Sequence, residues 1–415
     1  MRADWRRLSL EEAGVVLIDC DHRTPASAEE GYPYVAIPQL REGRIDFSGA
    51  RRITKEDFTS WTRKARPQGY DVVLSRRCNP GETAVVPVGA EFAVGQNLVL
   101  LRADGTGVYP PFLRWLARGP DWWEQVGKFI NVGAVFDSLK CAHVPKFVLA
   151  IPPLPEQRAI AEFLWQLDDK IELNRQMSET IEKLARALFA SWFGVLDPDR
   201  MPDGWTAASL GDHVEVTRGL SYSSAGLVED GIPLHNLDSI ADTGGYRFDG
   251  LKHFRGDYQP RHLVNAGDLL VVNTDLTWAF QRIAQPAVVP KRFGDLSLFS
   301  ADLFRVRPRS GSWLTARFLY LGLTSTRLRQ LVVGYSNGTT VNHLAPDGLK
   351  RPRLSVPPAE LVQRFDQAVQ PLFAKQEQLQ LESEVLARLR DILLLKLMSG
   401  EIRLKEVQQA AAEAN

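Results

Sequence analysis

The sequence predicts an α+β protein in which two α/β domains are separated by two long helices that pair as an antiparallel coiled coil. Three observations support this prediction: an internal duplication at an offset of about 205 residues, short β-branched strand runs in each copy, and a long helical pattern that ends each copy. At 415 residues the chain is also too long for one ordinary core. We therefore expect at least two domains related by a pseudo-twofold internal repeat.

The duplication consists of short matches that keep the same order in both halves of the chain. Any single match could be coincidence, but several matches in order at a near-constant offset are not chance. The matches are Asp71-Val-Val-Leu with Asp268-Leu-Leu-Val, Ala84-Val-Val-Pro with Ala287-Val-Val-Pro, Leu98-Val-Leu-Leu-Arg with Leu303-Phe-Arg-Val-Arg, Phe112-Leu with Phe318-Leu, Ile151-Pro-Pro with Val356-Pro-Pro, and Gln157-Arg with Gln363-Arg.

Each Pro-Pro pair is followed by about 39 residues of helical pattern, which corresponds to roughly 55–60 Å at 1.5 Å per residue. Pro155 suits a first helical turn, and Gly194 suits the position just after a helix. Two helices of equal length in one chain can pair with each other, although each could instead cover only its own domain. The near-heptad positions are Leu164, Leu167, Ile171, Ile181, Leu184, Leu188 and Trp192 in the first copy and Leu372, Leu379, Leu386, Leu393 and Leu397 in the second.

The expected organisation follows the repeat. It comprises a first domain at 1–150, a first helix at 151–197, a second domain at 198–355, a second helix at 356–404 and a flexible tail at 405–415.

Composition predicts a soluble cytoplasmic protein. No apolar stretch approaches the roughly 18 residues of a membrane helix, and the N-terminus has no apolar signal core. Three widely spaced cysteines predict neither disulfides nor a thiolate zinc site. The net charge is zero, but residues 51–77 hold eight basic and three acidic side chains. Such a run is usually only a solvated face, and a nucleic-acid partner is the alternative.

No catalytic residues are predicted. The chain lacks a GxxxxGK[ST] phosphate loop, a GxGxxG after a strand and an HExxH helix, and its seven histidines have no metal-ligand spacing, so no metal is expected. Asp168-Asp169-Lys170 matches a nuclease Asp-x-Lys pattern, but it lies in the middle of the first predicted helix. We expect these three residues to form a solvated helix face.

The helical segments resemble a known family, the specificity (S) subunits of type I restriction-modification systems. The run Ile151-Pro-Pro-Leu-Pro-Glu-Gln-Arg-Ala-Ile-Ala-Glu-Phe-Leu is similar to the start of the family's central conserved region, and Leu394-Leu-Lys-Leu-Met-Ser-Gly-Glu-Ile-Arg resembles its C-terminal counterpart. The order of domain, helix, domain, helix is also the family's own. One departure is that Val356-Pro-Pro-Ala-Glu-Leu lacks the Pro-Leu-Pro-Glu-Gln form, so the two helix starts are not identical.

The resemblance implies a non-catalytic subunit with two target-recognition domains, each of which reads half of a bipartite, asymmetric sequence in double-stranded DNA. It further implies two modification (methyltransferase) subunits as partners, with restriction (ATP-dependent translocase and nuclease) subunits in some assemblies. This chain would bind no cofactor, whereas S-adenosylmethionine, ATP and Mg²⁺ would be held by those partners. The candidate docking residues are Pro155, Glu156, Gln157, Arg158, Trp192 and Phe193.

Candidate DNA-binding residues are Arg, Asn and Gln side chains that follow strands, because these have the forked donor and acceptor groups that read base edges. The loop after Ser75 and the loop from Asn273 match across the duplication, which predicts one loop with different contents. In the first domain the candidates are Arg63, Lys64, Arg66, Arg76, Arg77 and Asn79; in the second they are Asn273, Thr274, Asp275, Thr277, Gln281, Arg282, Tyr335, Asn337, Thr339 and Thr340. The alternative functions are a coiled-coil scaffold that binds no DNA and a stand-alone enzyme.

Overall fold

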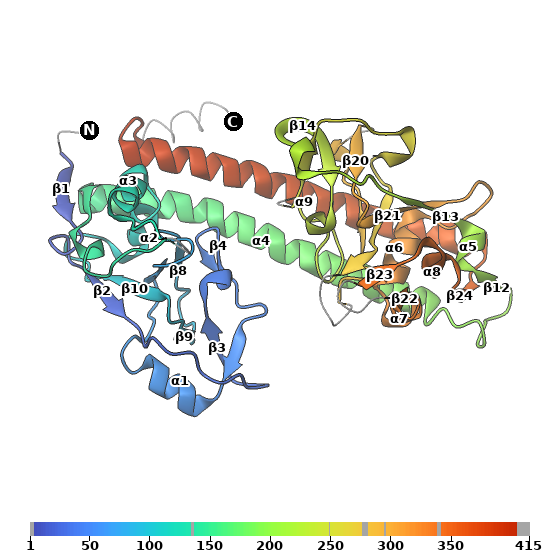
Figure 1. Cartoon of the computed structure of the whole chain (residues 1–415), viewed down its shortest axis with the longest axis horizontal. Helices are drawn as coiled ribbons and strands as arrows, with labels where there is room; N and C mark the ends of the chain where they lie inside the picture. Colours follow the sequence, from blue (N-terminus) through green and yellow to red (C-terminus); the bar gives the residue numbers. More distant parts are fainter. Residues whose placement is uncertain are drawn as a thin grey trace. The chain divides into compact units, whose positions relative to one another are not determined.

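The computed structural model describes residues 4–133, 137–248, 250–275, 281–293, 296–337 and 342–404. The chain forms two compact units, of which unit 1 is Met1–Leu173 with Glu382–Asn415 and unit 2 is Asn174–Leu381. The division passes through both long helices, so each unit contains one globular α/β part and a segment of each helix (Figure 1). The predicted tail at 405–415 lies outside the described residues.

Unit 1 is built around a four-stranded antiparallel sheet with the order β2-β10-β7-β8. A second sheet has the order β6-β3-β9, in which β3 and β9 run parallel. β1 pairs with β11, and β4 forms a hairpin with β5. The bounds are β1 Arg6–Ser9, β2 Val15–Asp19, β3 Tyr32–Val35, β4 Leu40–Arg41, β5 Arg44–Ile45, β6 Arg51–Ile53, β7 Val72–Ser75, β8 Thr83–Val85, β9 Ala93–Val94, β10 Leu98–Ala103, β11 Val148–Ile151, α1 Lys55–Thr62, α2 Leu113–Leu116 and α3 Pro120–Phe129.

The central sheet of unit 1 separates two apolar cores. Val72 and Leu74 of β7 point into the core shared with α2 and the long helices, whereas Val73 points into a second core on the other face. β10 alternates in the same way, because successive side chains of a strand point to opposite faces. Accordingly α2 and α3 lie against the long helices, while α1 lies at the far end of the globular part (Figure 1).

Unit 2 repeats this topology. Its central antiparallel sheet has the order β13-β21-β17-β19, and a second sheet has the order β15-β14-β20-β16, in which β14 and β20 run parallel. β12 pairs with β24, and a third sheet has the order β18-β23-β22. The bounds are β12 Thr206–Ser209, β13 Val214–Arg218, β14 Leu227–His235, β15 Lys252–Phe254, β16 Leu263–Val264, β17 Leu269–Val272, β18 Thr274–Asp275, β19 Pro286–Val288, β20 Ser297–Phe299, β21 Leu303–Pro308, β22 Ser336–Asn337, β23 Asn342–Leu344, β24 Arg353–Val356, α5 Leu210–His213, α6 Ala316–Thr324, α7 Thr326–Val333 and α8 Pro346–Lys350.

The predicted internal repeat is therefore confirmed in the central sheets, in the pairs β1–β11 and β12–β24, and in the sheets with a parallel pair, whereas the β4–β5 hairpin and β16 have no counterpart among the described strands. It extends to individual ion pairs, since the buried Asp71 accepts a hydrogen bond from Nε of Arg102 at 2.8 Å, and Asp268 accepts the corresponding bond from Nε of Arg307 at 2.7 Å. In unit 1 Asp71 directly precedes β7, and Arg102 lies on the neighbouring strand β10. In unit 2 Asp268 directly precedes β17, and Arg307 lies on the neighbouring strand β21.

The two long helices are α4, Leu154–Phe193, and α9, Ala359–Ser399. Both end at glycines with left-handed backbone angles, Gly194 at φ 58° and Gly400 at φ 75°, as the prediction for Gly194 required. The helices run antiparallel in each unit. In unit 1 Asp168 and Lys170 pair with Arg390 and Glu382 respectively, and in unit 2 Glu182 and Phe193 contact Gln376 and Phe365.

Two expectations about these helices are wrong. Leu184 was predicted for the helix seam, but its side chain is 47% exposed. Asp168 was predicted on a solvated face, but it is completely buried because arginines from three other elements surround it; Asp169 and Lys170 are exposed as expected. Among the described helices, none combines the length and hydropathy needed to span a bilayer.

Candidate nucleic-acid interface

The loop that follows β7 is held by its main chain. The amide of Arg76 donates to the carbonyl of Asn97 at 3.0 Å, and the carbonyl of Arg76 accepts from the amide of Leu139 at 2.8 Å. The turn beyond it closes through Gly81 N–H to the Ser75 carbonyl at 3.0 Å. Arg76 and Arg77 therefore project from a backbone that is fixed on both sides.

Unit 2 holds the matching loop with the same two main-chain hydrogen bonds. Asn273 donates to the carbonyl of Asp302 at 3.0 Å, and its own carbonyl accepts from Leu344 at 2.8 Å. Arg76 thus corresponds to Asn273, and Arg77 corresponds to Thr274. The predicted equivalence of the two loops is confirmed at the level of the backbone, and we call this shared arrangement the loop frame.

The loop frame also places a distant turn of the chain beside the loop in each unit. In unit 2 Thr274 is paired with His343, which is paired on its other side with Asn337. In unit 1 Arg77 bridges to Ser138, which bridges to Asn131. A loop after the central strand and a distant turn therefore meet at one small surface in each unit, which is a three-stranded sheet in unit 2 and a pair of isolated bridges in unit 1.

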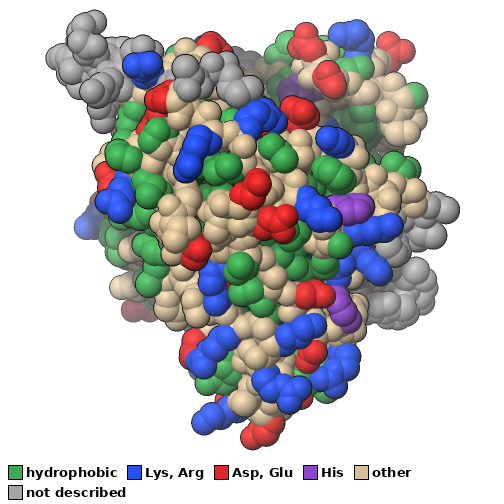
Figure 2. Space-filling model, turned by 90° about the vertical axis from the view of Figure 1, so that its left-hand side faces the viewer, with side chains coloured by type: hydrophobic (Ala, Val, Ile, Leu, Met, Phe, Trp, Pro, Cys, Tyr) green, Lys and Arg blue, Asp and Glu red, His purple; other side chains and the backbone are tan. Residues whose placement is uncertain are grey.

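The contents of the frame in unit 1 are basic and exposed. Arg77 and Asn79 are exposed, and the guanidinium of Arg76 lies 3.5 Å from Nδ1 of His22. Lys64 is exposed too and donates to the carbonyl of Cys20 at 3.4 Å. Cys20 and His22 both follow the end of β2. Figure 2 looks onto unit 1 and shows Lys and Arg side chains gathered at its lower end, where Figure 1 places α1, and two His side chains among basic ones at the right edge.

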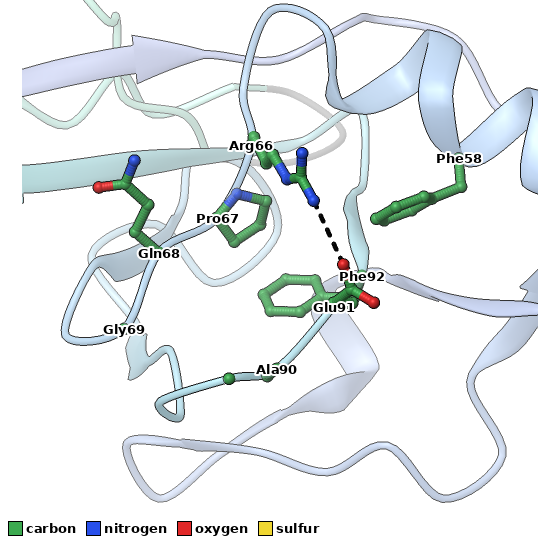
Figure 3. Close-up of a pocket in the computed structure, with 9 residues that line it drawn as sticks. Phe58, Arg66, Pro67, Gln68, Gly69, Ala90, Glu91 and Phe92 are labelled. Carbon is green, nitrogen blue, oxygen red and sulfur yellow. Dashed lines mark hydrogen bonds and ion pairs between the residues drawn. The ribbon is translucent and has the colours of Figure 1, made fainter.

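Arg63 and Arg66 are exposed on the segment after α1, and Arg66 is partly neutralised. Its guanidinium pairs with Glu91 at 3.2 Å at the edge of a pocket of about 360 Å³. Figure 3 shows this pair between the rings of Phe58 and Phe92. Arg66 is therefore less available to an anion than Lys64.

In unit 2 three predicted readers lie inside the fold. Asn273, Thr274 and Asp275 are 2%, 4% and 0% exposed. Asn273 donates to the carbonyl of Ala301 at 3.0 Å and accepts from the Thr274 hydroxyl at 2.8 Å, and Asp275 accepts from the backbone amide of Arg282 at 2.8 Å. Their polar groups are satisfied within the protein, so these side chains stabilise the loop frame and do not reach its surface.

Arg282 is also committed to its own unit. Its guanidinium donates to the carbonyls of Leu237 and Ile240 at 2.6 and 2.9 Å and pairs with Asp242 at 3.0 Å. The exposed candidates that remain in unit 2 are Gln281, Tyr335 and Asn337, whereas Thr277, Thr339 and Thr340 lie outside the described residues.

Sequence reasoning missed two exposed residues of this surface in unit 2. His343 lies between Thr274 and Asn337 in the small sheet, and the guanidinium of Arg351 stacks 5.8 Å from the ring centre of Tyr335. The buried, exposed, buried pattern of Asn342-His343-Leu344 is the alternation of a half-buried strand, and it could have drawn attention to His343.

The candidate docking residues at the start of α4 serve different purposes. Pro155 and Arg158 are exposed, and Glu156 accepts a hydrogen bond from the indole of Trp5 at 3.1 Å. Gln157 is fully buried, where its amide bonds the backbone of Tyr109, Gly107 and Pro152 at 2.8 Å each. The side chain of Gln157 thus fixes the helix start to the globular part of unit 1.

At the other end of α4 the aromatic pair is largely internal to unit 2. Phe193 is 4% exposed and lies within 5.0 Å of the ring of Phe318 and 4.8 Å of that of Phe365, measured between ring centres. Trp192 is half-buried against Phe365. Of the pair, only Trp192 offers surface to another molecule.

A surface that the sequence reading did not identify lies on α9. Val385, Leu389, Ile392 and Leu395 are 66%, 42%, 54% and 52% exposed. Their spacing of four, three and three residues places them on one helix face. We call these four residues the α9 stripe.

One group of side chains in unit 1 has the composition of a metal site, since atoms of Asp19, Cys20 and His22 lie within 4.8 Å of one another. The chemistry does not fit a cation. Burial and the neighbouring Asp19 raise the pKa of the Cys20 thiol to about 11, and the thiol contacts the carbonyl of Gly95 at 3.2 Å. Arg76 beside His22 adds positive charge at the same place.

Comparison with known proteins agrees with this architecture. Residues 22–183 match the family described as Type I restriction modification DNA specificity domain. The MjaIX specificity subunit of Methanocaldococcus jannaschii is 24% identical over 97% of this chain and 95% of its own length. The HindI specificity subunit of Haemophilus influenzae is 21% identical over 96% of this chain and all of its own length.

Solved structures that resemble the chain come from the same group of proteins. The S subunit from M. genitalium is 14% identical with a TM-score of 0.49, covering 96% of this chain and 98% of its own. The HsdS subunit from Thermoanaerobacter tengcongensis is 18% identical with a TM-score of 0.36, covering 97% and 98%. By the family match and the full-length relatives, the chain is similar along most of its length to the specificity subunits of type I restriction-modification systems.

Proposed function

We propose that this chain reads a split, asymmetric DNA target, with the globular part of each unit on one half-site. The observation that carries the proposal is the loop frame, which occurs once per unit with the same backbone and different side chains. A repeated frame provides two readers, and different contents make the two half-sites different.

In unit 1 the proposed reader is basic. Arg77 and Asn79 would read base edges, because a guanidinium matches the O6 and N7 acceptors of guanine and an amide matches adenine. Lys64 and Arg76 would contact phosphates beside them, which fixes register without reading sequence.

In unit 2 the proposed reader is mostly neutral. Gln281 and Asn337 carry the amides that match adenine, and Tyr335 and His343 add hydrogen-bonding groups on the same surface. Arg351, stacked on Tyr335, is a cation that could contact phosphate. This difference in composition is why we expect the two half-sites to differ in sequence.

We further propose that the chain recruits the catalytic subunits. The α9 stripe is a row of exposed aliphatic side chains on a long helix, which suits the apolar face of an amphipathic partner helix. Two modification subunits would supply adenine-N6 methylation with S-adenosylmethionine. In assemblies that also cleave DNA, restriction subunits would supply ATP- and Mg²⁺-dependent chemistry. We expect this complex to act in the cytoplasm, where its DNA substrate lies.

The test is methylation mapping of DNA from cells that co-express the chain with its modification subunit, whose binding is verified by co-purification. We expect N6-methyladenine in both halves of one split, asymmetric motif. If no motif appears although the modification subunit is bound, the scaffold function replaces DNA reading. Turnover of a substrate by the purified chain without any partner would instead indicate a stand-alone enzyme.

A further inference from the structure

Asp168 is a fully buried carboxylate in the middle of α4, and DNA reading and partner docking give it no role. Burial of a lone carboxylate is unfavourable unless cations compensate it. Here three guanidinium groups converge on it from three elements: Arg114 of α2 at 2.7 Å, Arg390 of α9 at 2.6 Å and Arg44 of β5 at 3.6 Å. Burial alone would raise the pKa of Asp168, but Arg114, Arg390 and Arg44 together lower it, so the group is ionised at neutral pH.

Two further carboxylates complete the cluster. Glu172 pairs with Arg44 at 3.3 Å, and Asp391 pairs with Arg390 at 2.8 Å. Three guanidinium groups thus face three carboxylates, and the buried guanidinium of Arg118 lies close to Arg390, Asp391 and Asp168 as well. Arg114 is also held between the rings of Trp115 and Trp165, at 4.3 and 4.4 Å from their centres. These contacts indicate a clamp between elements and not a ligand site.

The clamp reaches the globular part of unit 1 through the β4–β5 hairpin. Arg44 follows the hairpin tip and donates to the backbone carbonyl of Asp168 at 2.7 Å. The carbonyl of Gly43 accepts from Val85 at 3.0 Å and from Arg114 at 3.4 Å, so the tip is also tied to β8 and α2. At Gly43, with φ 80°, an added Cβ would lie 2.5 Å from the Arg118 guanidinium, so only glycine fits this approach.

From the hairpin the connection continues to the proposed DNA-reading surface. Ile45, the residue after Arg44, packs in the core that contains Cys20, Ala65 and Val73. Ala65 follows Lys64 directly, and Cys20 accepts the hydrogen bond from Lys64 through its carbonyl. The hairpin therefore joins the helix clamp to the core beneath the basic side chains of the loop frame.

Unit 2 has no such ionic cluster among its described residues at the matching place. α4 and α9 begin 205 residues apart, so Asp168 corresponds to Phe373, which contacts Tyr320 with ring centres 5.7 Å apart. There the Tyr320 hydroxyl donates to Glu182 of α4 at 2.8 Å, and Glu182 also pairs with Arg186 of the same helix at 2.8 Å. The charged clamp is a property of unit 1.

We propose that Asp168, Arg44, Arg114 and Arg390 form a positioning site that fixes the DNA-reading part of unit 1 on its helices and thereby restricts the complex to one spacer length between half-sites. This inference rests on the proposed function. Neighbouring spacer lengths differ by roughly 3.4 Å and about a tenth of a helical turn. To reject the neighbouring spacer lengths, the DNA-reading part of unit 1 must be held to within that displacement. Charged groups that converge from three elements fix both its position and its orientation.

The experiment maps methylation in cells that co-express the modification subunit with the unaltered chain or with Arg44→Ala, Asp168→Asn or Asp71→Asn. Arg44→Ala removes the partly exposed link from hairpin to helix with little risk to folding. Asp168→Asn removes the central charge without changing shape. Asp71→Asn is the control, because it breaks another buried ion pair of unit 1 that lies within the central sheet and does not touch the helices.

For Arg44→Ala and Asp168→Asn we expect the same half-site bases, with methylation at spacers one base pair longer or shorter raised at least tenfold over the unaltered chain. Asp71→Asn should lower the melting temperature and keep a single spacer. A single spacer in Arg44→Ala would overturn the proposal even if Asp168→Asn does not fold, and so would relaxed spacing in the control. If the unaltered chain gives no split motif, the proposed function fails before the clamp is tested.

Discussion

Arg77 and Lys64 of unit 1 lie on the same surface but are expected to do different work on DNA. Arg77 projects from the fixed loop frame, and bidentate readout by arginine is worth about 1–3 kcal/mol of discrimination. Arg77→Ala should therefore relax one base position of one half-site, while the rest of the motif persists. Methylation mapping of the variant measures this, and an unchanged motif would remove Arg77 from the reader.

Lys64 should contribute to affinity and not to sequence choice. Its ammonium group lies beside the loop frame, within 3.4 Å of a backbone carbonyl. Lys64→Ala should weaken binding of the assembled complex to all sequences about equally and reduce the slope of log K against log salt by about 1. Titrations of target and scrambled duplexes at several salt concentrations test this. Selective loss on the target alone would assign Lys64 to base reading.

His235 predicts a pH dependence of the stability of unit 2. It is buried between the Tyr246 hydroxyl at 2.7 Å and the Ser297 hydroxyl at 3.0 Å, and burial lowers its pKa to about 3. The unfolded chain takes up a proton near pH 6.5 whereas the folded chain does not, so the stabilisation present above that pH is lost as the pH falls toward 3.

Between pH 7 and 5.5 the unaltered chain should lose about 1 kcal/mol more free energy of unfolding than His235→Gln. Urea unfolding at the two pH values measures the difference. Equal losses in both proteins would mean that His235 titrates normally in the folded state.

Polar residues show how far a sequence predicts a site. Asn273, Thr274 and Gln157 were placed in the correct loops and helix start, yet their burial was not predicted. The partners that satisfy them, such as Ala301 and Tyr109, lie 28 and 48 residues away in sequence. Asp168 is the extreme case, since its partner Arg390 is 222 residues distant. Local spacing says which residue types are present, whereas tertiary contacts decide which of them face solvent.

The α9 stripe is a feature of one element, and its prediction concerns partner binding. Ile392→Glu places a charge in the middle of four exposed aliphatic side chains, where an apolar partner face would have to desolvate it. We expect at least tenfold weaker binding of the modification subunit, measured by co-purification and titration, with no change in melting temperature. Val88→Glu is the control, because Val88 is 70% exposed but lies outside the long helices. Equal binding by both variants would exclude the stripe as the docking surface.

For single elements, the sequence predicted where the long helices begin and end better than it predicted which helix faces are buried. Pro155 and Gly194 bracketed α4 to within a residue, because proline and glycine act through the local backbone. The heptad pattern was less reliable, as Leu184 shows. Each half of α4 also packs against a globular part, so the buried face is wider than a two-helix seam.

For the whole molecule, the division of the chain into two units suggests where spacing can be changed. Four residues inserted in each long helix, between Leu173 and Asn174 and between Leu381 and Glu382, leave the helix packing within each unit intact. They add about 6 Å of helix, close to two base pairs. We expect methylation mapping to show a longer spacer with both half-sites preserved. An altered half-site with the original spacer would contradict this.

The duplication was the sequence feature that predicted the organisation of the whole molecule as two similar halves. Short matches such as Ala84-Val-Val-Pro and Ala287-Val-Val-Pro lie on β8 and β19, which have the same place in their sheets. The strand order itself, including the parallel pairs β3–β9 and β14–β20, could not be predicted, because pairing of distant strands leaves no local pattern. The DNA sequence also stays beyond prediction, since it depends on a few exposed side chains of each loop frame.

The loop frame has a consequence for how such a protein can change over generations. Its shape depends on backbone amide and carbonyl groups, which every residue except proline supplies. Mutation of Arg76 or Arg77 to another such residue therefore leaves the backbone of the loop frame intact. In unit 2 the same freedom applies to the exposed Gln281 and Asn337 but not to Asn273 and Thr274, whose buried side chains stabilise the loop. A lineage could therefore acquire a new target one half at a time, by changes confined to the exposed side chains of one loop frame.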